Sequence, residues 1–118
     1  MESINMKVSI SPIEAAKRIV QDLESRSSSC ELVDRYESRN DYGQEIIVLV
    51  FEKFYMRNSS RASLTVTLEN LRDVTQVHAI GSGGGQGLFF KFDWGASNEF
   101  SSEVLSALRE FTYRGNSY

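Results

Sequence analysis

The spacing of apolar residues along the chain predicts strands interleaved with two helices. The stretch MKVSI (6–10) alternates apolar and polar residues, as a short strand does. A helix is predicted over about 12–25, because a Ser11–Glu14 capping box and Pro12 at the first helical position open it. The apolar stripe of this helix consists of Ile13, Ala16, Ile19, Val20 and Leu23.

The middle of the chain is typical of strands joined by short turns. Residues 30–38 form a moderate strand pattern, and 74–80 another. Residues 45–56 are the most apolar stretch and predict a central strand with both faces largely covered. Residues 61–69 alternate most clearly, and a last strand is expected over 88–94. In 61–69 the apolar face is predicted to carry Ala62, Leu64, Val66 and Leu68, and the polar face Arg61, Ser63, Thr65, Thr67 and Glu69.

A second helix is expected at the C-terminal end. Ser97 and Asn98 are capping candidates, and Glu99 would lie in the first turn. Its apolar stripe comprises Phe100, Val104, Ala107, Leu108 and Phe111. The strand–helix–strands–helix order predicts an α+β fold, a twisted antiparallel sheet of about five or six strands with both helices on one face.

Composition narrows the class of protein. The 118 residues are 41% hydrophobic and 25% charged, which is typical of one globular domain over 1–118. A net charge of −3 disfavours nucleic acid and anionic membranes as partners. Cys30 and His78 are the only residues of their kinds, which excludes an intramolecular disulfide and multi-histidine zinc sites and predicts no cofactor. The absence of a long apolar run predicts a cytoplasmic protein.

The sequence GSGGGQG (81–87) holds five of the eight glycines. Its spacing does not fit a dinucleotide fingerprint, no Gly-Lys pair exists for a Walker A loop, and a strand is expected after it. A wide hairpin loop between 74–80 and 88–94 is therefore favoured. Close packing against another chain and anion or ligand binding remain alternatives. Each glycine lowers stability through conformational entropy, so a run of glycines indicates a place where another group comes close to the backbone. The ligand-binding candidates in this run are Ser82, Gly83, Gly84 and Gly85.

Other side chains could carry chemistry. His78 is a candidate general base, but a structural histidine in a strand is the favoured interpretation. Cys30 is a candidate nucleophile, but a small half-buried residue is favoured. Lys91 and Asp93 could form a polar platform on the open face of the sheet, with a solvated face as the plain alternative. The platform would also include Arg61, Thr65 and Thr67.

The segment RASLTVTLE…VHAIGSGGGQGLFFKFDW, with the closing helix, resembles a family of small bacterial proteins of unknown function. The resemblance is strongest over 61–113 and rests on Ser63–Leu68, Ser82–Gly84 and Phe89–Lys91. It implies a bacterial cytosolic setting and supplies no catalytic or binding residues. The order of elements is also similar to the TATA-binding-protein architecture, a likeness of fold that implies no DNA binding.

Three hypotheses of function follow from the sequence. The first is a non-enzymatic binding or interaction module, with a second copy of the chain as one candidate partner. The second is an enzyme that acts on a small molecule with His78, Lys91 and Asp93. The third, which the negative charge disfavours, is binding of single-stranded nucleic acid on the open face of the sheet.

Overall fold

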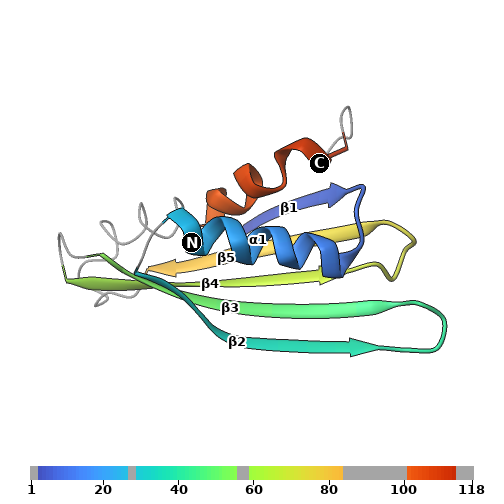
Figure 1. Cartoon of the computed structure of the whole chain (residues 1–118), viewed down its shortest axis with the longest axis horizontal. Helices are drawn as coiled ribbons and strands as arrows, with labels where there is room; N and C mark the ends of the chain where they lie inside the picture. The colour runs from blue at the N-terminus through green and yellow to red at the C-terminus, as the bar shows by residue number, and fades with distance from the viewer. Residues whose placement is uncertain (1–2, 27–28, 56–58, 84–100, 114–118) are drawn as a thin grey trace.

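A computed structural model describes residues 3–26, 29–55, 59–83 and 101–113 (Figure 1). Five strands and a long helix precede a short helical segment over 101–107 and a 3-10 turn, η2. Their bounds are β1 Ser3–Val8, α1 Pro12–Arg26, β2 Cys30–Arg39, β3 Glu45–Tyr55, β4 Ser60–Glu69, β5 Thr75–Gly83 and η2 Arg109–Phe111.

The five strands form one antiparallel sheet in the order β1-β5-β4-β3-β2. Strands β2 to β5 follow one another as a meander, whereas β1 joins the far side of β5, with Ser3 opposite Ile80. Since every neighbouring pair is antiparallel, β1 and β2 run in the same direction at opposite edges. Helix α1 connects them by crossing one face of the sheet (Figure 1).

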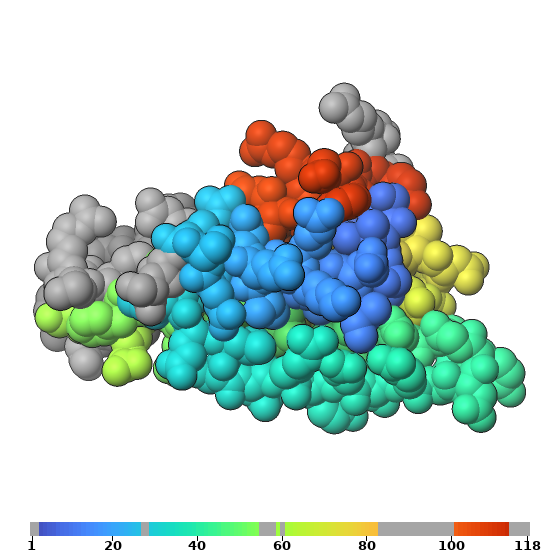
Figure 2. Space-filling view, in the orientation of Figure 1, coloured from blue at the N-terminus to red at the C-terminus, as the bar shows by residue number. Residues whose placement is uncertain are grey.

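The hydrophobic core lies between the sheet and the two helices. Figure 1 and Figure 2 show α1 beside the C-terminal helical segment, both on the same face of the sheet. Ala15, Ala16, Ile19 and Leu23 of α1 are fully buried. They share one cluster with Val104 and Leu108 and with sheet residues that include Met6, Val8, Leu49, Phe51, Leu64, Val66 and Val77. The described elements therefore form an α+β fold, as the sequence predicts.

The alternation predicted for β4 is confirmed, because Ala62, Leu64, Val66 and Leu68 are all buried and the residues between them are not. Strand β3 differs from its prediction. Ile47, Leu49 and Phe51 are buried, but Ile46, Val48 and Val50 on its other face are only partly covered. An antiparallel sheet with its helices on one side explains the difference, since described helices cover only one face of β3.

Two element boundaries also differ. The first strand was expected over 6–10 but occupies Ser3–Val8, because residues 9–11 turn the chain into α1. Ser11 accepts a hydrogen bond from the Glu14 amide at 3.2 Å and so caps the helix, as expected. The predicted strand 88–94 and the start of the C-terminal helix lie outside the described residues.

The glycine run requires a correction. We expected 81–87 to be a loop, but β5 continues to Gly83 and pairs with β4. Gly81, Ser82 and Gly83 stand opposite Leu64, Ser63 and Ala62. The interpretation of the first three residues as a turn is wrong, because the long partner strand β4 offers a ladder that glycine can join. Residues 84–87 lie outside the described part of the chain.

The two edges of the sheet differ. Residues 111–113 close part of the β1 edge, where Ser9 donates to the Phe111 carbonyl at 2.9 Å and Tyr113 to the Lys7 carbonyl at 3.1 Å. An antiparallel bridge joins Val8 to Thr112 between these bonds. Within the described chain, no strand pairs with the outer side of β2 (Figure 1).

Candidate functional site

The open face of the sheet, the side opposite α1, brings together side chains from all five strands. We define it by its central row, in which each residue stands opposite the next on the neighbouring strand. From edge to edge, this row comprises Tyr36 of β2, Val48 of β3, Thr67 of β4, His78 of β5 and Asn5 of β1. Paired residues in a ladder point to the same side of the sheet, so these five side chains form a continuous stripe.

A second row runs beside the first. It comprises Asp34, Val50, Thr65, Ile80 and Ser3. The two rows together give the open face an apolar centre, formed by half-buried Val48, Val50 and Ile80, with threonine hydroxyls between them. Tyr36 stands at one end of the first row and is 58% exposed. No described helix covers this surface.

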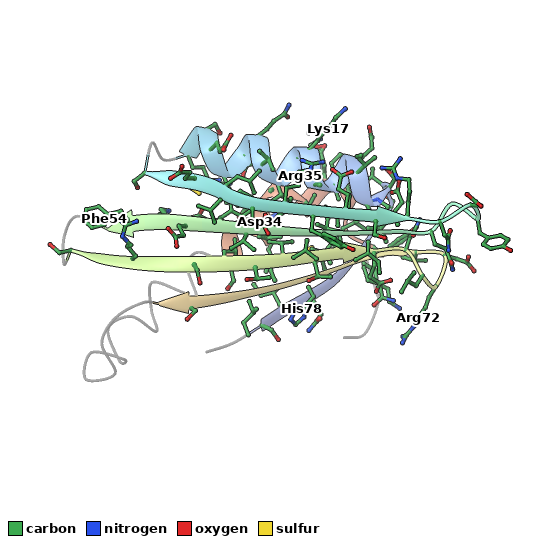
Figure 3. The ribbon with its side chains drawn as sticks, turned by 90° about the horizontal axis from the view of Figure 1, so that it is seen from below. Lys17, Asp34, Arg35, Phe54, Arg72 and His78 are labelled. Atoms are coloured by element: carbon green, nitrogen blue, oxygen red, sulfur yellow. The ribbon has the colours of Figure 1, made fainter. Side chains whose placement is uncertain are left out.

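His78 projects from β5 on the open face, on the side away from α1 (Figure 3). Its Nδ1 lies 2.8 Å from Oδ1 of Asn5. An amide oxygen only accepts hydrogen bonds, so Nδ1 is the donor in this pair, and Nε2 is the ring nitrogen that Asn5 does not contact. The imidazole is thus oriented by a neutral amide and not by a carboxylate, an arrangement that suits ligand recognition better than strong general-base catalysis.

The other predicted site residues divide into two groups. Ser82 and Gly83 belong to β5, and Ser82 stands opposite Ser63 on the open face, two positions along the strand from Ile80. Gly84, Gly85, Lys91 and Asp93 lie outside the described residues. The structure therefore brings His78 and Ser82 onto one surface, and the platform of Lys91 with Asp93 stays a prediction.

The polar face predicted for 61–69 is confirmed for Thr65 and Thr67, which stand on the open face. Arg61 lies at its end, where its guanidinium is 5.7 Å from the centre of the Phe54 ring and 3.6 Å from a Glu52 carboxylate oxygen. Both contacts are solvent-exposed, so they orient Arg61 without fixing it.

The charge of the open face is acidic. Pairing and alternation place Glu31, Asp34, Glu52 and Glu69 on it, against Lys7 and Arg61 as the basic side chains in the described part of the chain. A surface that binds phosphate backbones needs the opposite balance. The charge therefore disfavours nucleic acid on this face.

A separate polar cluster lies on the core side. Lys53 of β3 forms an ion pair with Glu103 of the C-terminal helical segment, with Nζ–Oε2 2.9 Å, and stands opposite Cys30. Burial raises the pKa of the Cys30 thiol to about 11, an effect that Lys53 opposes and that Glu103 and Glu24 reinforce. A thiol of this pKa is protonated near neutral pH and is a poor nucleophile. The sequence predicts a half-buried Cys30, whereas the structure buries it more deeply, with only 7% exposed.

Sequence reasoning missed the residues at the centre of the open face. Ile46, Val48 and Val50 were assigned to the core with the rest of the apolar strand. The alternation of 61–69 could have identified them. A strand with one polar face belongs to a sheet that is covered on one side only, so the neighbouring apolar strand 45–56 also exposes one of its faces. Tyr36 was also missed, because an aromatic residue in a charged strand is not distinctive.

Other kinds of site find no support among the described residues. They contain no group of three or more histidine, cysteine or carboxylate side chains placed to hold a metal ion. They also contain no helix with the length and apolar character needed to cross a membrane.

Comparison with known protein families assigns the chain to a family. The model of a family of unknown function, DUF6054, matches residues 1–112. No curated protein and no solved structure matches the chain. The likeness to the TATA-binding-protein architecture accordingly stays a prediction.

Proposed function

Because the chain belongs to a family of unknown function, which supplies no activity, we propose from the structure that it is a non-enzymatic binding module. The open face of the sheet is the proposed binding surface. The observation that carries this proposal is the row from Tyr36 to Asn5, which crosses all five strands without a described helix over it. Only Tyr36 in this row is a large hydrophobic side chain with more than half of its surface exposed, and Val48 beside it is half-buried, so the row offers both aromatic and aliphatic contact area to a ligand.

The chemistry of the surface indicates the class of ligand. Val48, Val50 and Ile80 supply a flat apolar centre, and Thr65 and Thr67 add hydroxyl groups that donate or accept hydrogen bonds. Such a surface fits a flat, partly apolar molecule or protein segment that carries hydrogen-bonding groups at its rim. The acidic side chains around it favour a neutral or basic ligand over an anionic one.

His78 and Ser82 would act in recognition. With Nδ1 directed to Asn5, the Nε2 atom of His78 is the ring nitrogen left for a hydrogen bond with a ligand. Ser82 adds a hydroxyl on the same strand. The enzymatic alternative needs Lys91 and Asp93 beside His78, and the neutral partner of His78 gives it no support.

The test is a thermal-shift screen of small molecules and short peptides against the wild type and two variants. A ligand that binds the native state raises the melting temperature by mass action. Val48→Lys places a charge at the centre of the open face, and Leu71→Lys makes the same change at an exposed apolar residue in the β4–β5 turn. We expect a ligand whose shift is kept by Leu71→Lys and lost by Val48→Lys. Ligands that stabilise Val48→Lys as strongly as the wild type would refute the assignment of the surface.

A further inference from the structure

In the described part of the chain no strand pairs with the outer edge of β2, and two hydrogen bonds show which of its backbone groups face that edge. Asn40 donates its amide to the Gln44 carbonyl at 3.1 Å, and Asn70 donates to the Glu45 carbonyl at 3.3 Å. The first bond makes Asn40 and Gln44, which follow β2 and precede β3, a hydrogen-bonded pair of this ladder. The second bond shows that the backbone groups of Glu45 point toward β4 and not toward β2. Hydrogen-bonded and non-hydrogen-bonded pairs alternate in an antiparallel ladder, so Arg35, Glu37 and Arg39 direct their N–H and C=O groups to the free edge.

The side chains of these residues alternate in charge. Arg35 and Glu37 stand opposite Leu49 and Ile47, so they point to the side of the sheet that carries α1, and Figure 3 shows Arg35 there. Glu37 forms ion pairs with Arg35 and Arg39 of the same strand. The edge thus presents a positive, negative, positive series beside unpaired backbone groups.

This charge series is complementary to itself. When a strand pairs with its own copy about a two-fold axis, residue i meets residue j and residue j meets residue i. In the new ladder, residues whose N–H and C=O groups point to the edge pair with one another. Three registers are then possible: Arg35 opposite Arg35, Arg35 opposite Glu37, or Glu37 opposite Glu37 of the second copy. Like charges directly opposite are destabilising, so of these three registers the one that pairs Arg35 with Glu37 is favourable, and it forms the contact twice.

The favourable register places Tyr36 on the two-fold axis. Tyr36 then faces its own copy as a non-hydrogen-bonded pair, in which side chains approach most closely. The two rings meet on the open face, where Tyr36 is 58% exposed in the single chain. A register centred on Ser38 would also join opposite charges, Glu37 with Arg39, but it would use only the end of β2, which stops at Arg39.

We propose that two copies of this chain associate through their β2 edges, in antiparallel register centred on Tyr36, so that the described five-stranded sheets of the two copies become continuous. Natural proteins protect free edges with charged side chains, proline or bulges, and the charges of β2 are compatible with self-pairing because they alternate in sign. In β2 the register shift between Leu32 and Asp34 limits pairing at one end, while the regular segment 34–38 stays free of proline. With about five residues paired on each strand the contact is small, so we expect a weak, concentration-dependent dimer.

Sedimentation velocity over a range of protein concentrations tests the proposal. We expect the wild type to dimerise, and to do so less at about 1 M salt than at about 0.1 M, since salt screens the charge pairs. Glu37→Arg should abolish the dimer, and the double variant Arg35→Glu with Glu37→Arg should restore it, because the exchanged charges are again complementary. Arg72→Glu, a charge reversal in the exposed β4–β5 turn, is the matched control and should leave the dimer intact.

Cross-linking tests the register. Under mild oxidation Tyr36→Cys should form a disulfide-linked dimer, since residues on the axis of a non-hydrogen-bonded pair approach within disulfide range. Ser38→Cys should not, because it would face Asp34 of the second copy. The native Cys30 is buried, and oxidation of the wild type measures any disulfide-linked dimer that forms through it. A wild type that stays monomeric at every concentration, a dimer indifferent to Glu37→Arg, or cross-linking at 38 in place of 36 would each overturn the proposal.

The outcome is separable from that of the proposed binding function. Tyr36 belongs to both surfaces, but the dimer contact is made along the backbone edge of β2, whereas the ligand surface is centred on Val48 of β3. A monomeric wild type that still binds a ligand through Val48 would refute the dimer alone.

Discussion

Lys53 and Glu103 lie fifty residues apart in the chain and form an ion pair between β3 and the C-terminal helical segment, with Nζ–Oε2 2.9 Å. Their side chains are 14% and 19% exposed, so water screens this pair less than the surface pairs of the sheet. The second carboxylate oxygen of Glu103 is buried and has no hydrogen-bond partner in the described structure. Glu103 therefore depends strongly on Lys53.

Lys53→Met should destabilise the fold. It leaves the Glu103 carboxylate partly buried without its cation, and we expect the free energy of unfolding to fall by about 1.5–3 kcal/mol. Urea denaturation measures the change. Arg61→Met is the matched control, because Arg61 and its partner Glu52 are 69% and 46% exposed, and it should change stability by less than about 1 kcal/mol. Equal losses in the two variants would contradict the prediction.

Cys30 should make stability depend on pH in the alkaline range. Its pKa is raised from 9.0 to about 11 in the folded state, chiefly by burial. The contribution is fully present below about pH 9 and is lost as pH rises toward about 11, because the unfolded chain releases the thiol proton first. We expect Cys30→Ala to be less stable than the wild type near neutral pH and to lose less stability over this range. Parallel pH dependences of the two proteins would contradict the assignment.

Phe111 should hold the C-terminal end of the chain against α1 and β1. The Arg18 guanidinium lies 4.8 Å from the centre of the Phe111 ring, and the ring packs against the core. Phe111→Ala should lower the free energy of unfolding by about 1–3 kcal/mol, since the ring is only partly buried. Leu105→Ala, at an exposed position of the same segment, should change it by less than about 0.5 kcal/mol. Thermal and urea denaturation of both variants provide the comparison.

Gly43 should be needed for the turn between β2 and β3. Its φ angle is +83°, a conformation that other residues rarely adopt. A Cβ atom at this position would meet nothing within 4 Å, so the penalty of Gly43→Ala is a backbone one, about 1 kcal/mol of stability. Asp41→Ala in the same exposed turn is the control, because Asp41 does not have a positive φ. An unchanged melting temperature for Gly43→Ala would contradict this role.

Local patterns predicted the elements well. The Ser11–Glu14 capping box, with Pro12 at the first helical position, predicted where α1 begins. The alternation of 61–69 predicted which residues of β4 are buried. These features succeed because they depend on residues close together in the chain. The α+β class followed from the order of the elements.

Long-range pairing could not be read from the same patterns. Nothing local in Gly81–Gly83 shows that β4 extends far enough to pair with them, so the sequence predicts a loop where β5 continues. On the open face, Val48 and His78 are thirty residues apart in the chain, yet both stand opposite Thr67, one on each neighbouring strand. The register of β2 against β3, which decides which edge groups are free, is likewise a property of the assembled sheet.

The pairing of β1 with β5 also has a consequence for how the chain folds. Strands β2 to β5 join through short turns and can assemble from neighbours, but Ser3 reaches its partner only when Ile80 is available. During synthesis, the first strand therefore waits unpaired while the meander forms. Contacts of such large sequence separation are slow to form, so we expect β1 to dock late and its amides to exchange with solvent before those of β4.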